Sequence, residues 1–474
     1  MASPSQVLVS FLLLSSTLIL ASTNPQNSTD GAVGMDTEEL MGLFEVVGAL
    51  LEDPDWAQMH PYPCTDTPWP GIQCEVGQEP DSMFHVTKIH VGPDVATPAC
   101  KSSPKLSQSI LKLPYLKVLS IFNCFLTTKV SLPSYLFGAS SSLEQLVIKS
   151  NPGFSEEIPT TLAEVATLRV LSLSQNSFYG GVPKELGGLS RLEQLDLSYN
   201  HLTGEIPLEI GGLTSLTIFD LSWNRLQGQV PCSIGQLQSL QKVDLSSNRL
   251  VGRVPSDIGK LNKMVLLDLS HNLIEGPIPE ALSGLKELEY LVLEDNPINT
   301  GVPLFIGKLG KLTVLSLSGC EMTGSIPTAL SSMGNLTTLS LDRNKLTGAI
   351  PSSLGSLPHL GQLNLSQNRL SGEISFPVEF VTRLGKRLDV GGNSGFCTTP
   401  SLSHYFDAPA CSSSAKSHNR SWDEKHGRGT DDKRLKPSWY DGNRNSNASV
   451  GTQWGMLLWC FSSILTVILM GFLC

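Results

Sequence analysis

The chain has 474 residues, of which 40% are hydrophobic and 16% are charged, and its formal net charge is −10. This composition is typical of an ordered protein, and the acidic balance argues against a nucleic-acid partner, which would need a basic footprint. An acidic surface is compatible with basic peptides and proteins as partners.

An uncharged and mainly apolar stretch covers residues 7–20 and is followed by Ala21, Ser22 and Thr23. It is short for a membrane span and is typical of a secretory signal that is cleaved near small residues, although a first transmembrane helix is the competing interpretation. We therefore assign residues 1–23 to a signal peptide. Acceptor motifs for N-glycosylation agree with passage through the secretory pathway, and they lie at Asn27, Asn335, Asn364, Asn419 and Asn447.

Residues 37–53 have apolar residues at helical spacing, which predicts a helix ahead of the main pattern. From Leu143 onward the pattern L-x-x-L-x-L-x-x-N recurs every 24 or 25 residues, with Cys320 in the one gap. Two looser copies precede it, at 86–91 and at 116–121 with Cys124 in the asparagine position. The period predicts about thirteen stacked coils. The asparagines are Asn151, Asn176, Asn200, Asn224, Asn248, Asn272, Asn296, Asn344, Asn368 and Asn393.

Each coil alternates inward and outward positions on a short strand. Leu195 and Leu197 are expected to point inward, and Asp196 between them outward. Because one coil leaves both of its sides open, only a stack that is closed at its ends buries a continuous core. The asparagines should form an internal ladder that satisfies backbone groups where the chain leaves the strand.

A second signature, G-x-[IV]-P, follows the asparagine, as at 204–207 and 252–255. Together the two signatures resemble the plant-specific leucine-rich repeat of receptor kinases, receptor-like proteins and polygalacturonase inhibitors. The fold class that we predict is an α/β repeat, a right-handed leucine-rich-repeat solenoid with a parallel concave sheet, capped at both ends. The repeats occupy residues 86–396.

The resemblance also implies two caps that carry disulfides. The N-terminal cap covers 24–85 and pairs Cys64 with Cys74, and the C-terminal cap covers 397–411 and pairs Cys397 with Cys411. Such pairs fit an oxidising compartment. We expect a third pair between Cys100 and Cys124. Cys232 and Cys320 are 88 residues apart, which places them about 17 Å apart at roughly 4.7 Å per strand, so both should be free thiols.

The tail contains two segments after the repeats. Residues 412–454 are rich in serine, asparagine and charge and are typical of a flexible stalk. Residues 455–474 form a hydrophobic segment long enough to span a bilayer. Cations precede this segment and none follows it, and small residues at 446–449 resemble an attachment site. We favour a glycolipid (GPI) anchor over a transmembrane helix, with the protein at the extracellular face of the plasma membrane.

No catalytic motif is present. The sequence has no H-E-x-x-H, no phosphate-cradling glycine loop and no recognisable serine, histidine and aspartate set, and no kinase motif follows the repeats. His201 and His271 lie beside ladder asparagines, where an exposed polar side chain is a better interpretation than a metal ligand. We therefore predict no enzyme activity, no cofactor and no metal.

Several segments narrow the resemblance, among them 60–64, 69–74, 122–125, 150–153 and 392–397. They look like the receptor-like proteins grouped with TOO MANY MOUTHS and Piriformospora indica-insensitive protein 2. This resemblance implies a kinase-less cell-surface co-receptor that works with receptor kinases, in development or in response to microbes, and possibly binds a secreted peptide. The alternative is a wall-associated inhibitor of a microbial hydrolase, like the polygalacturonase inhibitors, which end shortly after their C-terminal cap.

Concave positions of four successive coils hold aspartates, with two aromatic residues at the edge of the same face. At roughly 4.7 Å per strand the aspartates form an acidic stripe about 14 Å long. Such a stripe suits a basic peptide or an arginine-bearing receptor surface, although exposed charges on a half-buried sheet need no ligand. A glycan at Asn364 would obstruct the C-terminal part of this face. The candidate contact residues are Asp196, Asp220, Asp244, Asp268, Tyr199 and Trp223.

Overall fold

The computed structural model describes residues 34–78, 82–93, 98–138, 141–406 and 408–411. The expected signal peptide, stalk and anchor lie outside the described residues, as do the acceptors Asn27, Asn419 and Asn447. In the part that is described, no helix combines the length and the apolar character needed to cross a membrane.

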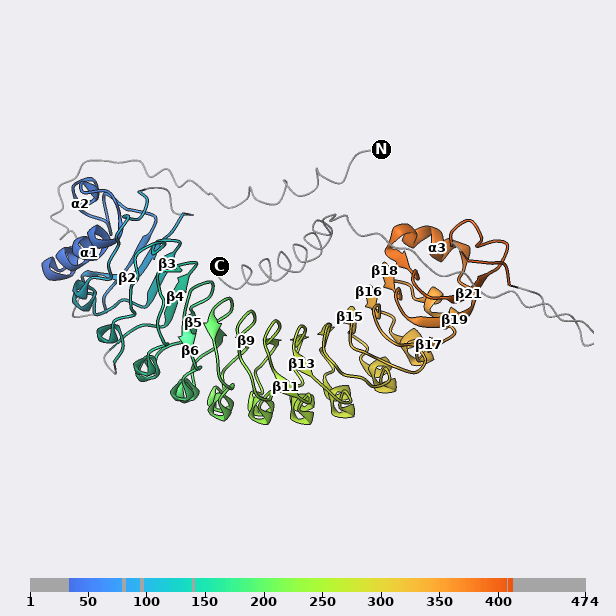
Figure 1. Cartoon of the computed structure of the whole chain (residues 1–474). Coiled ribbons are helices and arrows are strands. Elements are labelled where there is room, and N and C mark those ends of the chain that lie inside the picture. Colours follow the sequence, from blue (N-terminus) through green and yellow to red (C-terminus); the bar gives the residue numbers. More distant parts are fainter. Residues whose placement is uncertain (1–33, 79–81, 94–97, 139–140, 407, 412–474) are drawn as a thin grey trace, which may run out of the picture. The chain divides into compact units, whose positions relative to one another are not determined.

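One sheet of 14 strands runs through the described coils, and its strand order follows the sequence (Figure 1). The expected leucine-rich-repeat solenoid is confirmed. The strands are β1 (Ile72–Val76), β2 (Phe84–Val91), β3 (Val118–Phe122), β4 (Gln145–Lys149), β5 (Val170–Ser172), β7 (Gln194–Asp196), β9 (Ile218–Asp220), β10 (Lys242–Asp244), β12 (Leu266–Asp268), β14 (Tyr290–Val292), β15 (Val314–Ser316), β16 (Thr338–Ser340), β18 (Gln362–Asn364) and β20 (Leu388–Asp389).

The first strand departs from the expected all-parallel sheet, because β1 pairs with β2 in the antiparallel sense. Only residues 77–83 join these two strands. A parallel pairing needs a crossover of a dozen or more residues, so the short connection leaves only the antiparallel arrangement. The remaining pairs, from β2 to β20, are parallel.

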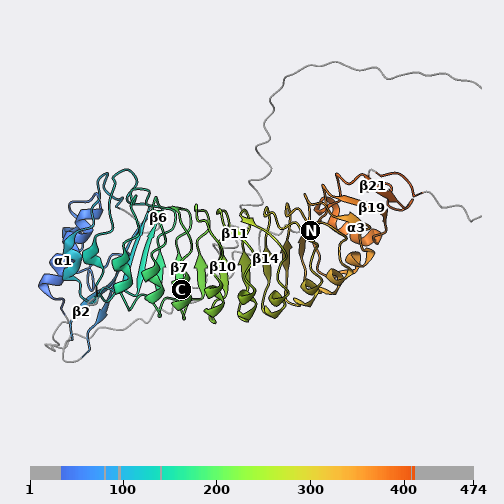
Figure 2. The ribbon, with the colours of Figure 1, turned by 60° about the horizontal axis from the view of Figure 1, so that its bottom comes forward.

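Each coil that starts with a strand of the large sheet from β2 to β16 returns along the opposite side of the stack through a short 3-10 helix (Figures 1 and 2). From η4 onward these helices start directly after a proline, whose ring fixes φ near its helical value, as for Pro207 with φ −68°. They are η2 (Gln108–Lys112), η3 (Ser134–Leu136), η4 (Thr160–Glu164), η5 (Lys184–Gly188), η6 (Leu208–Gly212), η7 (Cys232–Gln236), η8 (Ser256–Lys260), η9 (Glu280–Gly284), η10 (Leu304–Lys308), η11 (Thr328–Ser332) and η12 (Ser352–Ser356).

Small additional sheets link neighbouring coils beyond the ladder turn. They are β6 (Tyr179–Gly180) with β8 (His201–Leu202), β11 (Val251–Gly252) with β13 (Leu273–Ile274), and β17 (Thr347–Gly348) with β19 (Arg369–Ile374) and β21 (Gly395–Thr398). Near the C-terminal end of the stack lie α3 (Val378–Leu384) and η13 (Gly385–Arg387).

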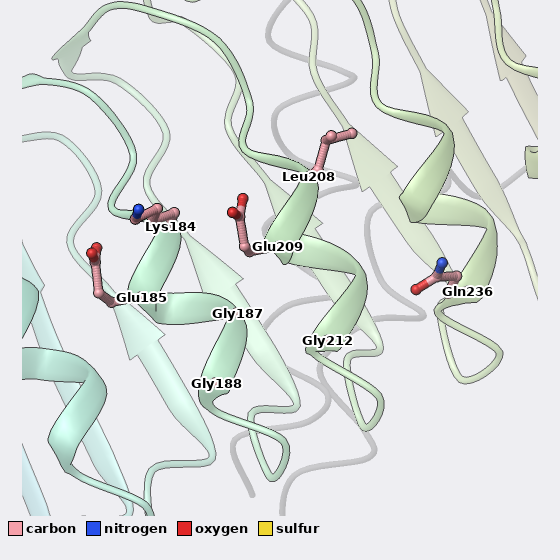
Figure 3. Close-up of a pocket in the computed structure, with 8 residues that line it drawn as sticks. All are labelled: Lys184, Glu185, Gly187, Gly188, Leu208, Glu209, Gly212 and Gln236. Carbon is pink, nitrogen blue, oxygen red and sulfur yellow. The ribbon is translucent and has the colours of Figure 1, made fainter.

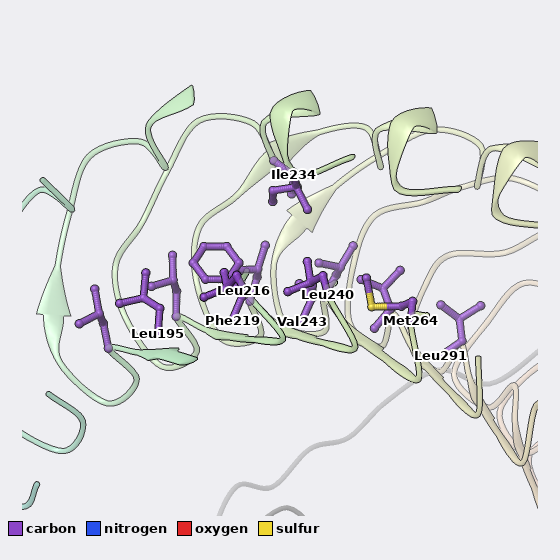
Figure 4. Packing of buried hydrophobic residues seen from close by; sticks show 14 of the residues in the cluster. Leu195, Leu216, Phe219, Ile234, Leu240, Val243, Met264 and Leu291 are labelled. Carbon is purple, nitrogen blue, oxygen red and sulfur yellow. The ribbon is translucent and has the colours of Figure 1, made fainter. Parts of the chain in front are cut away.

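The core is a continuous row of apolar side chains between the sheet and the 3-10 helices (Figure 4). Leu171, Leu195, Leu245 and Leu269 have no exposed surface, as the inward pattern predicts. A fully buried leucine contributes roughly 1.5–3 kcal/mol. Since every coil supplies the same set, burial is shared along the stack rather than concentrated at one centre.

The asparagine ladder is present and connects consecutive coils. The Asn200 amide donates to the carbonyl of Leu173 in the preceding coil and of Leu197 in its own, and its oxygen accepts from the N–H of Phe178. Cys320 takes over only the donor role, with its sulfur 3.1 Å from the carbonyl oxygen of Leu293. Burial raises the pKa of this thiol to about 12, so it remains a donor.

The N-terminal end of the stack is held by α1 (Thr37–Leu50), followed by α2 (Trp56–Met59). Helix α1 buries Leu43 and Val47 completely. Its Glu39 is itself buried, accepts the N–H of Val86 at 2.7 Å and pairs with His85 Nδ1 at 2.8 Å. A buried carboxylate with two partners fixes α1 on the first repeat strand.

Three disulfides join Cys64 with Cys74, Cys100 with Cys124, and Cys397 with Cys411. Of the described cysteines, Cys232 and Cys320 are free, the first exposed and the second buried. These pairings agree with the sequence-based expectation.

Glycines let the 3-10 helices of adjacent coils approach closely, as in the shallow depression between η5 and η6 (Figure 3). A Cβ atom on Gly187 would lie 2.1 Å from the carbonyl oxygen of Glu209, whereas a Cβ on Gly188 would meet nothing within 4 Å. The two neighbours on one helix therefore differ sharply in their tolerance of a side chain.

We expect Gly187→Ala to lower the free energy of unfolding by roughly 1–3 kcal/mol, the usual cost of overpacking. Gly188→Ala is the matched control and should leave stability unchanged or slightly higher, because it restricts the unfolded chain. Chemical denaturation followed by circular dichroism measures both. Equal stability of the two variants would contradict the close packing of η5 on η6.

Candidate functional site

The four predicted aspartates lie in register on neighbouring strands of the concave sheet. Asp196 pairs with Asp220, Asp220 with Asp244 and Asp244 with Asp268. We call these four residues the aspartate column. On its C-terminal side the same position is taken by Val292, so the acidic run is limited to β7, β9, β10 and β12.

Two of these aspartates are buried and two, Asp244 and Asp268, are half-buried, whereas the sequence suggested solvated side chains. Asp196 and Asp220 are only 9% exposed. In each coil one carboxylate oxygen accepts the backbone N–H and the hydroxyl of the serine two residues later, as Ser222 does for Asp220 at 2.9 and 2.7 Å. The Leu-Asp-Leu-Ser sequence thus holds each carboxylate in one orientation on the face.

Burial and mutual repulsion make the ionised state of the column costly. Burial raises the pKa of Asp220 well above its ordinary value, and the charges of Asp244 and Asp196 raise it further. Burial likewise raises the pKa of Asp244 and, together with Asp244, that of Asp268 to about 8. A cation brought to this face would relieve the repulsion.

The two predicted aromatic residues are brought together at the edge of the same face. The rings of Tyr199 and Trp223 stack with centroids 5.3 Å apart and an angle of 7° between planes. They remain 46% and 45% exposed. The pKa of the Tyr199 hydroxyl is raised by burial and then by the charges of Asp220 and Asp244, which places the ring pair beside the aspartate column.

Tyr199 and Trp223 belong to a row of residues that each precede the ladder position of a coil. We call this row the left-handed column, because its members have φ between 51° and 65°. Such a conformation is uncommon for residues other than glycine. From Ser150 onward its members are Ser150, Gln175, Tyr199, Trp223, Ser247, His271, Asp295, Gly319, Arg343 and Gln367.

Sequence reasoning missed an ion-pair network in this column. Arg343 Nη1 lies 2.7 Å from Asp295 Oδ1, two coils away, and His271 Nδ1 lies 3.2 Å from Asp295 Oδ2. Arg343 reaches Asp295 across the intervening coil because that coil has Gly319 in the left-handed column. A Cβ atom on Gly319 would lie 2.1 Å from the Asp295 carboxylate. The sequence contained the information needed, since His271, Asp295 and Arg343 each directly precede the ladder position of their coil.

Two glycosylation acceptors fall within the described residues. Asn335 is exposed, and its amide donates to the carbonyl of Gly310. Asn364 lies on β18 in register with Ser340, in the position that aspartates occupy in the aspartate column. It accepts from the N–H and hydroxyl of Ser366 at 3.1 and 2.8 Å.

No group of three or more histidine, cysteine, aspartate or glutamate side chains is arranged to hold a metal ion within the ranges given above. His201 is exposed, and His271 contacts Asp295. The groups that the concave face presents in this region are carboxyls, hydroxyls and aromatic rings.

Replacement of Asp268 by asparagine should stabilise the protein increasingly as pH rises. Because the folded-state pKa of about 8 lies above the ordinary 3.8, protonation favours the folded state, and this stabilisation is lost between about pH 4 and 8. Asparagine cannot ionise, and Asn364 demonstrates that it keeps the serine bonds. The gap in Tm between variant and wild type, measured by scanning fluorimetry, should widen from pH 4 to pH 9.

Asp257→Asn on η8 is the control, because a hydrogen bond from Lys260 lowers the pKa of Asp257 instead. The Tm of Asp257→Asn minus the Tm of wild type should not increase from pH 4 to pH 9. A constant gap for Asp268→Asn would contradict the burial of an acidic column.

Comparison with known proteins matches the repeats to the family described as Leucine rich repeat, at residues 166–226, 238–298 and 310–370. Three Arabidopsis thaliana proteins are similar over part of the chain. Receptor like protein 29 is 41% identical over 37% of this chain and 36% of its own, Piriformospora indica-insensitive protein 2 is 34% identical over 32% and 36%, and Protein TOO MANY MOUTHS is 36% identical over 30% and 28%. The matches thus span about a third of each relative.

Two solved structures share the fold over three quarters of the chain. The crystal structure of PEPR1-AtPEP1 is 28% identical with a TM-score of 0.62, covering 76% of this chain and 48% of its own. The ectodomain of the Arabidopsis thaliana receptor kinase GASSHO1/SCHENGEN3, in complex with CASPARIAN STRIP INTEGRITY FACTOR 2, is 25% identical with a TM-score of 0.58, covering 75% and 47%. The chain therefore has the leucine-rich-repeat fold, and over about a third of its length it is similar to plant receptor-like proteins.

Proposed function

We propose that the protein is a kinase-less cell-surface receptor-like protein that acts as a co-receptor with receptor kinases, and that it has no catalytic chemistry of its own. The proposal is supported by the similarity to plant receptor-like proteins and by the fold it shares with a receptor-kinase ectodomain. Its partner would be a receptor-kinase ectodomain, alone or together with a secreted peptide.

The observation that carries the proposal is the aspartate column with its adjacent aromatic pair. Four carboxylates lie in register, two of them buried and two half-buried. Keeping them side by side has an energetic cost that solubility alone does not require. A basic partner surface would lower that cost and would gain speed of association from the attraction. The stacked rings of Tyr199 and Trp223 add the exposed aromatic area that is enriched at binding hot spots.

The position of Asn364 favours the middle of the concave face over its C-terminal part. A glycan on this residue would stand four strands away from Asp268, on the same face. Bulky and hydrated, it would exclude a protein partner from the strands around β18. The face formed by residues 196–271 is therefore the proposed docking region.

The proposal is tested by replacing all four members of the aspartate column with asparagine. Tagged protein is purified from plant membranes, and associated receptor kinases are quantified by mass spectrometry. Recovery of the kinase partner should fall at least severalfold, and its dependence on salt should weaken, because exposed charge attraction is screened by ions.

The control is a variant with the same change of net charge on the side of the stack that carries the 3-10 helices. It carries glutamine at Glu164, Glu185, Glu209 and Glu280, which are exposed on η4, η5, η6 and η9, and should recover the partner as wild type does. Equal recovery by both variants would remove the aspartate column from the interaction. Recovery of no receptor kinase with wild type would contradict the co-receptor role.

Membrane attachment through a glycolipid is tested separately. Treatment of intact cells with a phosphatidylinositol-specific phospholipase should release the protein into the medium, since the predicted signal at 446–474 would be exchanged for a lipid. Retention on the cells, with the peptide 455–474 still detected by mass spectrometry, would instead indicate a transmembrane helix.

A further inference from the structure

The aromatic stack at the edge of the concave face ends abruptly after Trp223. In the left-handed column Tyr199 and Trp223 follow one another on neighbouring coils, and their rings are nearly parallel. The next member is Ser247, whose backbone has nearly the same φ, 54° against 53° and 54°. The coil after Trp223 therefore has the same backbone conformation at this position but no aromatic ring.

One face of the Trp223 indole remains open as a result. Tyr199 covers the face toward the N-terminal side, so the other face is directed toward the coil of Ser247. The following member, His271, contacts Asp295 on the far side at 3.2 Å and so is directed away from Ser247. Trp223 and His271 are two strand spacings apart, about 9–10 Å, which leaves room for one planar group at the level of Ser247.

The aspartate column runs along one side of this opening. Trp223 follows Asp220 by three residues on the coil of β9, and Ser247 follows Asp244 by three residues on the coil of β10, so the opening lies next to the aspartate column. The next charged members of the left-handed column, His271 and Asp295, pair with each other. Outside that column, Lys242 lies two residues before Asp244 on β10. A cation that enters next to the indole would therefore meet carboxylates at its side.

The same face already contains one contact of this kind. Lys149 Nζ lies 5.7 Å from the centroid of the Phe122 ring, and the two residues are in register on β3 and β4. A cation supplied from the next coil thus covers an aromatic ring in the N-terminal part of the sheet. After Trp223 the same position in the left-handed column of the next coil holds Ser247.

We propose that the open face of Trp223 beside Ser247 receives an arginine side chain of a partner polypeptide, stacked on the indole with its charge directed toward Asp244. Arginine fits better than lysine, because its guanidinium is planar, stacks on aromatic faces and can bond two carboxylate oxygens at once. The inference rests on the proposed function and names the side chain that the docking region recognises.

Three peptides of equal length test the inference: acetyl-(Gly-Arg)4-amide and its analogues with lysine and with citrulline. Their affinities for the purified full-length chain are measured by isothermal titration calorimetry. Wild type should prefer the arginine peptide over the lysine peptide roughly two- to fivefold, the range of an exposed cation–π contact. The uncharged citrulline peptide should bind more weakly than both.

Two variants remove the arginine preference in different ways. Trp223→Gln deletes the indole and introduces a residue that the column already holds at Gln175 and Gln367. Ser247→Tyr fills the opening while leaving Trp223 and every aspartate in place, and Tyr199 demonstrates that the backbone accepts tyrosine. Both should bring the ratio of arginine to lysine affinity to about one. Gln367→Tyr, at the same position on a distant coil, should leave the ratio unchanged.

The outcomes separate this inference from the proposed function. The aspartate-to-asparagine quartet should weaken both basic peptides, and the arginine peptide more, because it also loses the paired bonds to Asp244. A wild-type ratio of one, no saturable binding of the arginine peptide, or a preference that survives Ser247→Tyr would each overturn the arginine assignment. If the preference is absent while the quartet still loses its receptor kinase, the docking region stands and only the assigned side chain is wrong.

Discussion

The bond of a buried asparagine amide to backbone groups of two coils is the interaction on which the stack depends. A single hydrogen bond contributes about 1 kcal/mol, but leaving a buried backbone group unpaired costs roughly 1–3 kcal/mol. Asn224 illustrates the arrangement, since it donates to the carbonyls of Leu197 and Leu221 and accepts from the N–H of Leu202. The leucines provide the core, and the ladder fixes how each coil turns away from its strand and joins the next.

The coil that lacks its asparagine demonstrates what the amide oxygen does. Cys320 donates to Leu293 but offers no comparable acceptor. The N–H of Ile298, which an asparagine oxygen would receive by analogy with Ile274 and Asn296, bonds to the carbonyl of Asn296 instead. The chain then places Asn299 in the left-handed region, at φ 52°. Local backbone rearrangement thus replaces the missing side-chain acceptor, and the parallel register of β14 with β15 is maintained.

The 24-residue period made most of this architecture predictable, because the same inward leucines and the same ladder residue return in each coil. The antiparallel β1 lies outside the period, and only the length of its connection to β2 determines its direction. For the candidate site the period predicted that Asp196 to Asp268 lie on one face. Their burial was not predictable from one coil, because it depends on hydrogen bonds from serines and on the neighbouring strands. The residues of the pair between Asp295 and Arg343 share one position of the repeat with Gly319, but the left-handed backbone at that position is visible only in the structure.

The left-handed column separates recognition from folding. Its members range from serine and glutamine to tryptophan, histidine, aspartate and arginine, yet the backbone at these positions is nearly constant. The free energy needed to hold a non-glycine residue at positive φ is thus supplied by the surrounding repeat, whichever side chain is present. None of these side chains enters the apolar core. A single substitution per coil in this column therefore changes the side chains presented along the edge of the sheet without changing the fold of the solenoid.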